Sequence, residues 1–297
     1  MRGGIIGTVP ALGDLAIMRV GMNLLLWTTE VGPSHRDLLR KIRDWGFDGV
    51  EIPIFSPHPQ RARELGLLLD DLGLERTAVT VVPPDANPIH QDPSVRAKAL
   101  EYLKSVVEAC HLAGIRLLAG PLHSPVGLLA GRSRTREEWR WALEILQQTA
   151  DLARSSRITL ALEFLNRFES YFLNCAKDTV EFTTQADRPN LGILYDSYHA
   201  HLEEKNVSAA IRTCAGALRH VHISENDRAT PGEGQVRWSE TFDTLKDVGY
   251  ADWMVIEAFG QAMPELAAAT CIWRRMFPSE EHLARNGLEW IRSNWDC

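Results

Sequence analysis

Four short apolar runs in the second half of the chain each lead directly into a residue that can bind a divalent cation. In chain order, the pairs are ITLAL before Glu163, LGILY before Asp196, ALRHV before His222, and WMVI before Glu257. Such a run is typical of a strand covered on both faces, and the carboxyl ends of these strands carry the active sites of α/β barrels. Three carboxylates and one imidazole suit Mn²⁺, Mg²⁺ or Co²⁺, and Zn²⁺ is not excluded. The four residues therefore predict a divalent-metal site.

The alternative is that these residues are structural. A single Asp or Glu at a strand end is more often a helix cap or a group that orders a loop. Four of them on successive strands are harder to explain in this way, because their side chains would converge and the carboxylates would repel one another. A divalent cation removes that conflict, so the metal site is the favoured interpretation.

Composition narrows the classes of partner and the compartment. The formal net charge of −7 argues against a nucleic-acid partner, because phosphate binding needs a basic face. No apolar run approaches the roughly 20 residues of a membrane span, so no membrane partner is predicted. The 5 cysteines are scattered, odd in number and never in a CxxC pair. They predict reduced thiols in a cytoplasmic protein.

The elements that must position the candidate ligands alternate regularly after Met18. The predicted strands are Arg19–Leu24, Gly49–Phe55, Thr77–Val82, Ile115–Ala119, Ile158–Leu162, Leu191–Tyr195, Leu218–Ile223 and Trp253–Ile256. The predicted helices are Ser34–Trp45, Gln60–Leu72, Ser94–Ala113, Thr135–Ser155, Lys177–Ala186, Val207–Ala215 and Trp238–Val248, with a helical tail over most of Pro264–Trp295.

Eight strand-then-helix units without hairpins predict an α/β fold, a single (β/α)8 TIM barrel with a long C-terminal helical tail. An open doubly wound sheet is the competing fold, but no GxGxxG follows the first strand. Residues 18–297 are predicted to form the catalytic barrel domain. Residues 1–17 are predicted to be an N-terminal leader or arm outside the barrel, and a short secretory signal is the alternative for this segment.

Three further polar residues lie just beyond the ligand-bearing strands and are predicted to face the same cavity. They are Glu169 in ALEFLNRFES, His199 in YDSYHAH and Arg228 in HVHISENDR. Each is also compatible with an ordinary surface loop.

Three other residues are placed by strand geometry. His220 shares a strand face with His222 two residues deeper, so it is predicted to pack or hydrogen-bond beneath the metal. Trp27 and Phe259 stand at strand ends where they are candidates for a pocket wall, or else belong to the core.

These residues resemble the ketose 3-epimerases, the D-tagatose/D-psicose (allulose) and L-ribulose 3-epimerase group of the xylose-isomerase-like TIM barrels. The EFLNRFE and YDSYH segments carry the resemblance most specifically, and it runs from about Met18 to the carboxyl terminus. It implies one Mn²⁺ or Co²⁺ ion, with Mg²⁺ as an alternative, bound by Glu163, Asp196, His222 and Glu257. It also implies sugar contacts by Glu169, His199 and Arg228.

The chemistry of a ketose 3-epimerase fits the residue types. Inverting a carbinol centre beside a ketone requires removal of a proton from one face and return of a proton to the other. A metal bound to the C2 carbonyl and C3 hydroxyl oxygens stabilises the enediolate that forms. Glu163 and Glu257, three strands apart, are predicted to be the acid–base pair. The expected substrates are free ketoses, with the pairs D-tagatose/D-sorbose, D-fructose/D-psicose and L-ribulose/L-xylulose as examples.

Other functions stay open at this point. A metal-dependent sugar isomerase, a hydroxypyruvate isomerase or an inosose dehydratase would use similar carboxylates. An endonuclease IV-like DNA-repair enzyme would need a histidine-rich three-metal cluster, which the strand ends do not supply beyond His222. A non-catalytic sugar-binding module would leave the paired glutamates unexplained.

The carboxyl-terminal stretch is predicted to make a subunit interface in a homodimer or homotetramer, the assemblies found among ketose 3-epimerases. It is unusually rich in large apolar residues, namely Trp273, Met276, Phe277, Trp290 and Trp295. The alternative is that all five seal the outer layer of the barrel.

Overall fold

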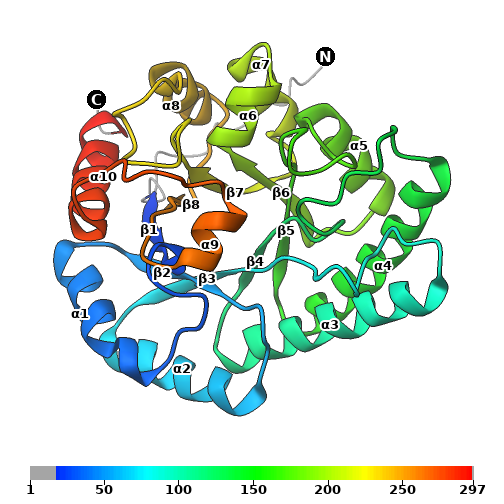
Figure 1. Cartoon of the computed structure of the whole chain (residues 1–297), viewed down its shortest axis with the longest axis horizontal. Helices are drawn as coiled ribbons and strands as arrows, with labels where there is room; N and C mark the ends of the chain where they lie inside the picture. Colours follow the sequence, from blue (N-terminus) through cyan, green and yellow to red (C-terminus); the bar gives the residue numbers. More distant parts are fainter. Residues whose placement is uncertain (1–17, 296–297) are drawn as a thin grey trace, which may run out of the picture.

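A closed, eight-stranded parallel barrel forms the centre of the protein (Figure 1). The computed structural model describes residues 18–295, so the predicted leader at residues 1–17 lies outside the described part. Each strand pairs in parallel with the next, and β8 closes the ring against β1. The strands are β1 Arg19–Asn23, β2 Gly49–Pro53, β3 Glu75–Val79, β4 Leu117–Gly120, β5 Thr159–Glu163, β6 Leu191–Asp196, β7 Leu218–Ile223 and β8 Trp253–Ile256. The predicted (β/α)8 barrel is confirmed.

Helices form a ring around the strands, and α9 lies inside that ring (Figure 1). The helices are α1 Arg36–Trp45, α2 Pro59–Leu72, α3 Pro93–Leu112, α4 Arg136–Ser155, α5 Ala176–Ala186, α6 Ser197–Glu203, α7 Val207–Cys214, α8 Trp238–Asp247, α9 Pro264–Ala269 and α10 Glu280–Trp295, with short 3-10 turns η1 Leu24–Leu26 and η2 Pro33–His35. Within residues 18–295, no helix has the length and apolar character that a membrane crossing requires.

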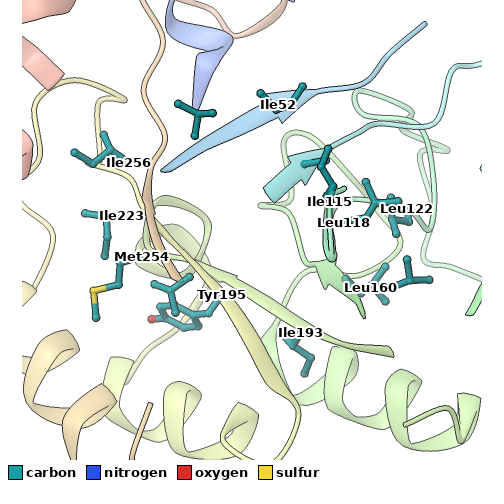
Figure 2. Packing of buried hydrophobic residues seen from close by; sticks show 14 of the residues in the cluster. Ile52, Ile115, Leu118, Leu122, Leu160, Ile193, Tyr195, Ile223, Met254 and Ile256 are labelled. Carbon is teal, nitrogen blue, oxygen red and sulfur yellow. The ribbon is translucent and has the colours of Figure 1, made fainter. Parts of the chain in front are cut away.

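Side chains alternate between the two faces of each strand, which separates two apolar layers. Outward-facing residues such as Ile52, Tyr195 and Met254 belong to the large cluster between barrel and helices, part of which is seen in Figure 2. The barrel interior holds a much smaller apolar layer of Leu117, Ala119, Ala161 and Leu194. Toward the carboxyl ends of the strands the interior also carries polar and charged residues, among them Glu51, Thr77 and His222.

Two features of the helices differ from the sequence prediction. The short helix α6 was not predicted; it begins immediately after β6 because the Asp196 side chain caps its first turn. The helical tail is present, but residues 270–279 interrupt it, and Cys271 adopts a positive φ of 59° where α9 ends. The other helices end within one residue of the predicted positions: α1 ends at Trp45 as predicted, and Gly46 follows with a left-handed φ of 100°.

The C-terminal aromatic residues pack mostly against their own barrel. The ring of Trp290 lies 5.2 Å from that of Trp238 and 5.6 Å from that of Phe242, and Trp295 lies 5.9 Å from Phe242. Phe277 is buried, whereas Trp273 is 73% exposed. Most of these aromatic side chains therefore pack within the outer layer of their own barrel. Trp273 does not, and it is available for contact with another protein surface.

Because Trp290 is packed against α8 and Trp273 is exposed, their substitutions should affect stability differently. Trp290→Ala removes the ring that docks α10 on α8, and we expect the free energy of unfolding to fall by about 2–3 kcal/mol, below the roughly 3–5 kcal/mol of a fully buried aromatic residue. Trp273→Ala removes little packing within the chain and should change the free energy of unfolding of the dissociated monomer by no more than about 0.5 kcal/mol. Urea unfolding followed by circular dichroism measures both. Equal losses in the two variants would contradict this packing.

Candidate metal centre and active site

Four potential metal ligands meet at the carboxyl end of the barrel. Glu163 and Asp196 are the last residues of β5 and β6, His222 lies near the end of β7, and Glu257 directly follows β8. One ligand atom from each lies within 4.8 Å of all the others. All four are buried, with at most 5% of any of them exposed. The structure thus brings together the complete set that the sequence singled out.

Asp196 divides its two carboxylate oxygens between two tasks. Its Oδ1 accepts hydrogen bonds from the backbone N–H groups of Tyr198 at 2.6 Å and His199 at 3.1 Å, and so caps α6. Its Oδ2 lies 3.6 Å from Nδ1 of His222. The helix cap and the ligand candidate are therefore the same residue, and the cap fixes the direction of the second oxygen.

His222 presents one ring nitrogen to the cluster. Its Nε2–H donates to Oε1 of Glu51 at 2.7 Å. Its Nδ1 is buried and has no hydrogen-bond partner within residues 18–295, although it lies 3.5 Å from Oε1 of Glu257. A buried nitrogen of this kind, aimed at three carboxylates, is the arrangement that a metal-binding imidazole needs. The donor set therefore fits a hard divalent cation.

Electrostatics in the cluster reflect crowded negative charge. Burial, followed by repulsion from Glu257, raises the pKa of Glu163 well above its usual value. Burial opposes protonation of His222, but attraction to Glu51 and Glu257 outweighs it and raises the pKa of this imidazole. Burial also works against ionisation of Asp196, yet attraction to the adjacent Arg228 and to His222 lowers its pKa. Protons and a cation would thus compete for the same positions.

Arg228 is held directly against two of the ligands. Its Nη1 donates to Oε2 of Glu257 at 2.8 Å and lies 3.3 Å from Oδ2 of Asp196. Its guanidinium stands 3.8 Å from the ring centre of Tyr198 and 5.1 Å from that of Phe259. The backbone at Arg228 has a φ of 62°, in the left-handed region that few side chains adopt. This unusual turn directs a long side chain from the β7–α8 loop back over the strand ends.

His199 and Glu169 are joined through Asn166, a residue of the same EFLNRFE segment. The backbone N–H of Asn166 donates to Nδ1 of His199 at 3.0 Å, and its side-chain Nδ2 donates to Oε1 of Glu169 at 2.7 Å. Nε2 of His199 lies 3.5 Å from Oε1 of Glu163 and 3.1 Å from Nη2 of Arg228. Burial lowers the pKa of His199 to about 4, so its ring is neutral at physiological pH.

The two predicted wall residues occupy different apolar clusters. Phe259 is buried with Leu25, Val79 and Ile272 in a small cluster separate from the main core, and its ring faces Arg228. Trp27 is only partly buried and packs against the main cluster. Phe259 is therefore adjacent to the candidate site, whereas the contacts of Trp27 are those of a core residue.

The sequence interpretation missed a buried polar layer directly beneath the ligands. Glu51 of β2 accepts hydrogen bonds from His220 and His222, and Asn23 of β1 and Thr77 of β3 also donate to it. The signal was present, because a glutamate inside the apolar run GVEIPIF needs a partner if the strand is buried. The predicted place of His220, beneath the metal and hydrogen-bonded, agrees with this geometry.

Comparison with known proteins places the chain in a family. The family model described as xylose isomerase-like TIM barrel matches residues 39–294. A probable ketose 3-epimerase of Synechocystis sp. is 30% identical over 278 residues, covering 94% of this chain and 97% of the relative.

Two solved structures of ketose 3-epimerases have the same fold as this chain. That of an L-ribulose 3-epimerase has a TM-score of 0.88 and 29% identity, covering 94% of this chain and 95% of its own. That of a D-allulose 3-epimerase from Methylomonas sp. in complex with D-allulose has a TM-score of 0.87 and 25% identity, covering 94% and 98%. The chain therefore belongs to the xylose isomerase-like TIM barrel family and, within it, to the ketose 3-epimerases, which are isomerases.

Proposed function

We propose that this chain epimerises free ketoses at C3 and uses one divalent metal ion held by Glu163, Asp196, His222 and Glu257. Mn²⁺ is the first choice, with Co²⁺ or Mg²⁺ as alternatives. The substrate pairs are of the type D-tagatose/D-sorbose, D-fructose/D-psicose and L-ribulose/L-xylulose. The observation that carries the proposal is the convergence of these four ligand atoms within 4.8 Å, with the free Nδ1 of His222 among them. The solved relative that holds D-allulose supports a ketose as the ligand.

In this mechanism Glu163 and Glu257 move the C3 proton. When bound, a divalent cation would polarise the carbonyl and neighbouring hydroxyl oxygen of the ketose and so acidify C3–H. One glutamate takes this proton on one face of the sugar, and the electron pair left behind moves toward the C2 carbonyl oxygen. The other glutamate returns a proton to C3 on the opposite face, which inverts the centre. The raised pKa of Glu163 suits a group that must hold a proton in part of this cycle.

Glu169, His199 and Arg228 are proposed to orient the C1–C2 end of the ketose. Nδ1 of His199 accepts the N–H of Asn166, and Nε2 lies beside both Oε1 of Glu163 and Nη2 of Arg228. The ring edge that carries Nε2 is therefore the part of His199 that is proposed to face the ketose. Arg228, fixed by Glu257 and by its stacking on Tyr198, supplies donors on the same side. Phe259 would cover one wall of this pocket, and Trp27 remains a second candidate for a wall residue.

Metal removal and product analysis test the function directly. We expect exhaustive chelation, checked by elemental analysis, to abolish turnover of D-fructose and L-ribulose, and Mn²⁺ or Co²⁺ to restore it. Chromatography should then show D-psicose formed from D-fructose. An aldose product would instead identify a sugar isomerase, and nicking of abasic DNA without ketose turnover would identify an endonuclease. Full activity in a metal-free preparation would refute the metal requirement.

Substitution of the two glutamates tests the proton transfer. Glu163→Gln and Glu257→Gln keep a ligand oxygen and side-chain size but remove the basic carboxylate. Each should lose about 10²–10⁴-fold in kcat, the usual range for general acid–base catalysis. Solvent deuterium should enter C3 of the ketose with the wild-type protein, and this exchange should fall in parallel. A variant that epimerises at nearly the wild-type rate would remove that glutamate from the pair.

We also propose that the protein is a homodimer or homotetramer. The exposed Trp273, in the segment between α9 and α10, supports an interface there, because aromatic residues are enriched at protein interfaces. Light scattering after size-exclusion chromatography should give two or four chains per particle at micromolar concentration, and Trp273→Asp should shift the population toward monomer. A monomeric wild-type protein would contradict the proposal, and an unchanged oligomer in the variant would place the interface elsewhere.

A further inference from the structure

Glu51 lies entirely within the barrel and is surrounded by hydrogen-bond donors. Its Oε1 accepts from Nε2 of His222 at 2.7 Å and from Nδ2 of Asn23 at 3.0 Å. Its Oε2 accepts from Nε2 of His220 at 2.8 Å and from the hydroxyl of Thr77 at 2.9 Å. None of the Glu51 side chain is exposed. Four donors from strands β1, β3 and β7 thus converge on one carboxylate, which is the full number that it accommodates in good geometry.

These contacts determine which nitrogen of each imidazole carries a proton. A carboxylate can only accept, so both histidines must present Nε2–H to Glu51. For His222, the consequence is that Nδ1, the nitrogen facing Asp196 and Glu257, is the one open to a cation. The other tautomer would place a lone pair against the Glu51 carboxylate and leave a proton fixed in the position of the metal.

Asn23 connects Glu51 to a second candidate ligand, Glu257. Its Nδ2 donates to Oε1 of Glu51 at 3.0 Å and to Oε1 of Glu257 at 3.3 Å. Its Oδ1 accepts the N–H of Leu25 at 2.9 Å, which fixes the orientation of the amide. Two of the four candidate ligands, one imidazole and one carboxylate, are therefore oriented from below by one connected set of side chains on β1 and β2.

We propose that Glu51 and Asn23 are positioning residues for the metal centre: Glu51 sets the tautomer and ring orientation of His222, and Asn23 couples it to Glu257. The inference rests on the proposed function, because it assumes that the four ligands hold a cation. Buried hydrogen-bond partners of metal ligands typically change metal affinity 10–100-fold when they are substituted.

A competing interpretation is that the Glu51 cluster is itself a cation site. Glu51, His220 and His222 do offer a compact set of ligand atoms. Their N···O distances of 2.7 and 2.8 Å are those of charge-assisted hydrogen bonds in which the nitrogen carries a proton. A cation there would have to remove the protons from both nitrogens. The cluster is better explained as support for the site above it.

Metal affinity separates this role from a purely structural one. Glu51→Gln keeps the size of the side chain but removes the negative charge and leaves one oxygen for four donors. We expect it to weaken Mn²⁺ binding 10–100-fold, measured as free Mn²⁺ by electron paramagnetic resonance during titration of the metal-stripped protein. The matched control is Glu138→Gln, because Glu138 is also a buried carboxylate with several donors, from Arg132, Thr135 and Tyr171, but lies at the start of α4. It should bind Mn²⁺ like the wild type even if its melting temperature falls.

A second variant keeps the inference testable if Glu51→Gln does not fold. Asn23→Ser retains an oxygen that can cap η1, as serine commonly does at helix starts, but removes both donations by Nδ2. It should weaken Mn²⁺ binding several-fold while the circular dichroism spectrum stays unchanged. Wild-type affinity in a folded Glu51→Gln or Asn23→Ser protein would overturn the inference and leave the proposed function standing. Failure of the wild-type chain itself to take up Mn²⁺ would overturn both.

Discussion

The accumulation of buried negative charge inside the barrel is the constraint on which the site depends. Glu51, Glu163, Asp196 and Glu257 all lie at one end of the ring with almost no access to water. Isolated ionised carboxylates are very costly in such surroundings, so each must be paired or protonated. The lower carboxylate, Glu51, is stabilised by two imidazoles and two further donors. The upper three share Arg228, His222 and, in the proposed function, a divalent cation.

The strand alternation explains why this charge does not disturb the hydrophobic core. Outward positions of the strands are apolar and pack against the helices, while the inward positions near the carboxyl ends hold the polar layer. Two residues apart on β7, His220 and His222 both point inward and both hydrogen-bond to Glu51, and His222 is also one of the four candidate ligands. The residues that alternate with them, Val221 and Ile223, pack in the hydrophobic core on the opposite face of the strand.

The loop after β4 contacts the end of β5 and the loop that follows it, and so helps to position Glu163 and Glu169. The buried His123, in the loop after β4, donates from Nε2 to the backbone carbonyl of Glu163 at 3.0 Å, and burial lowers its pKa to about 4, so it remains a neutral donor. The backbone N–H of Gly127 in the same loop donates to the carbonyl of Glu169 at 2.7 Å. The β4–α4 loop therefore supports the loop after β5 from the side, and the positions of Glu163 and Glu169 depend on both.

The sequence by itself determined the barrel, the order of its eight strands and the four candidate ligands, because strand period and apolar runs are local properties of the chain. The family resemblance in EFLNRFE and YDSYH was likewise readable without coordinates, and the comparisons confirm it. Only the tertiary structure revealed that Asp196 also caps α6, that Trp290 is docked on the barrel while Trp273 is exposed, and that Glu51 supports His222. Glu51 and His222 are 171 residues apart in sequence. Their contact arises across the closed ring, where the ends of non-adjacent strands meet, and no local pattern records which side chains face each other there.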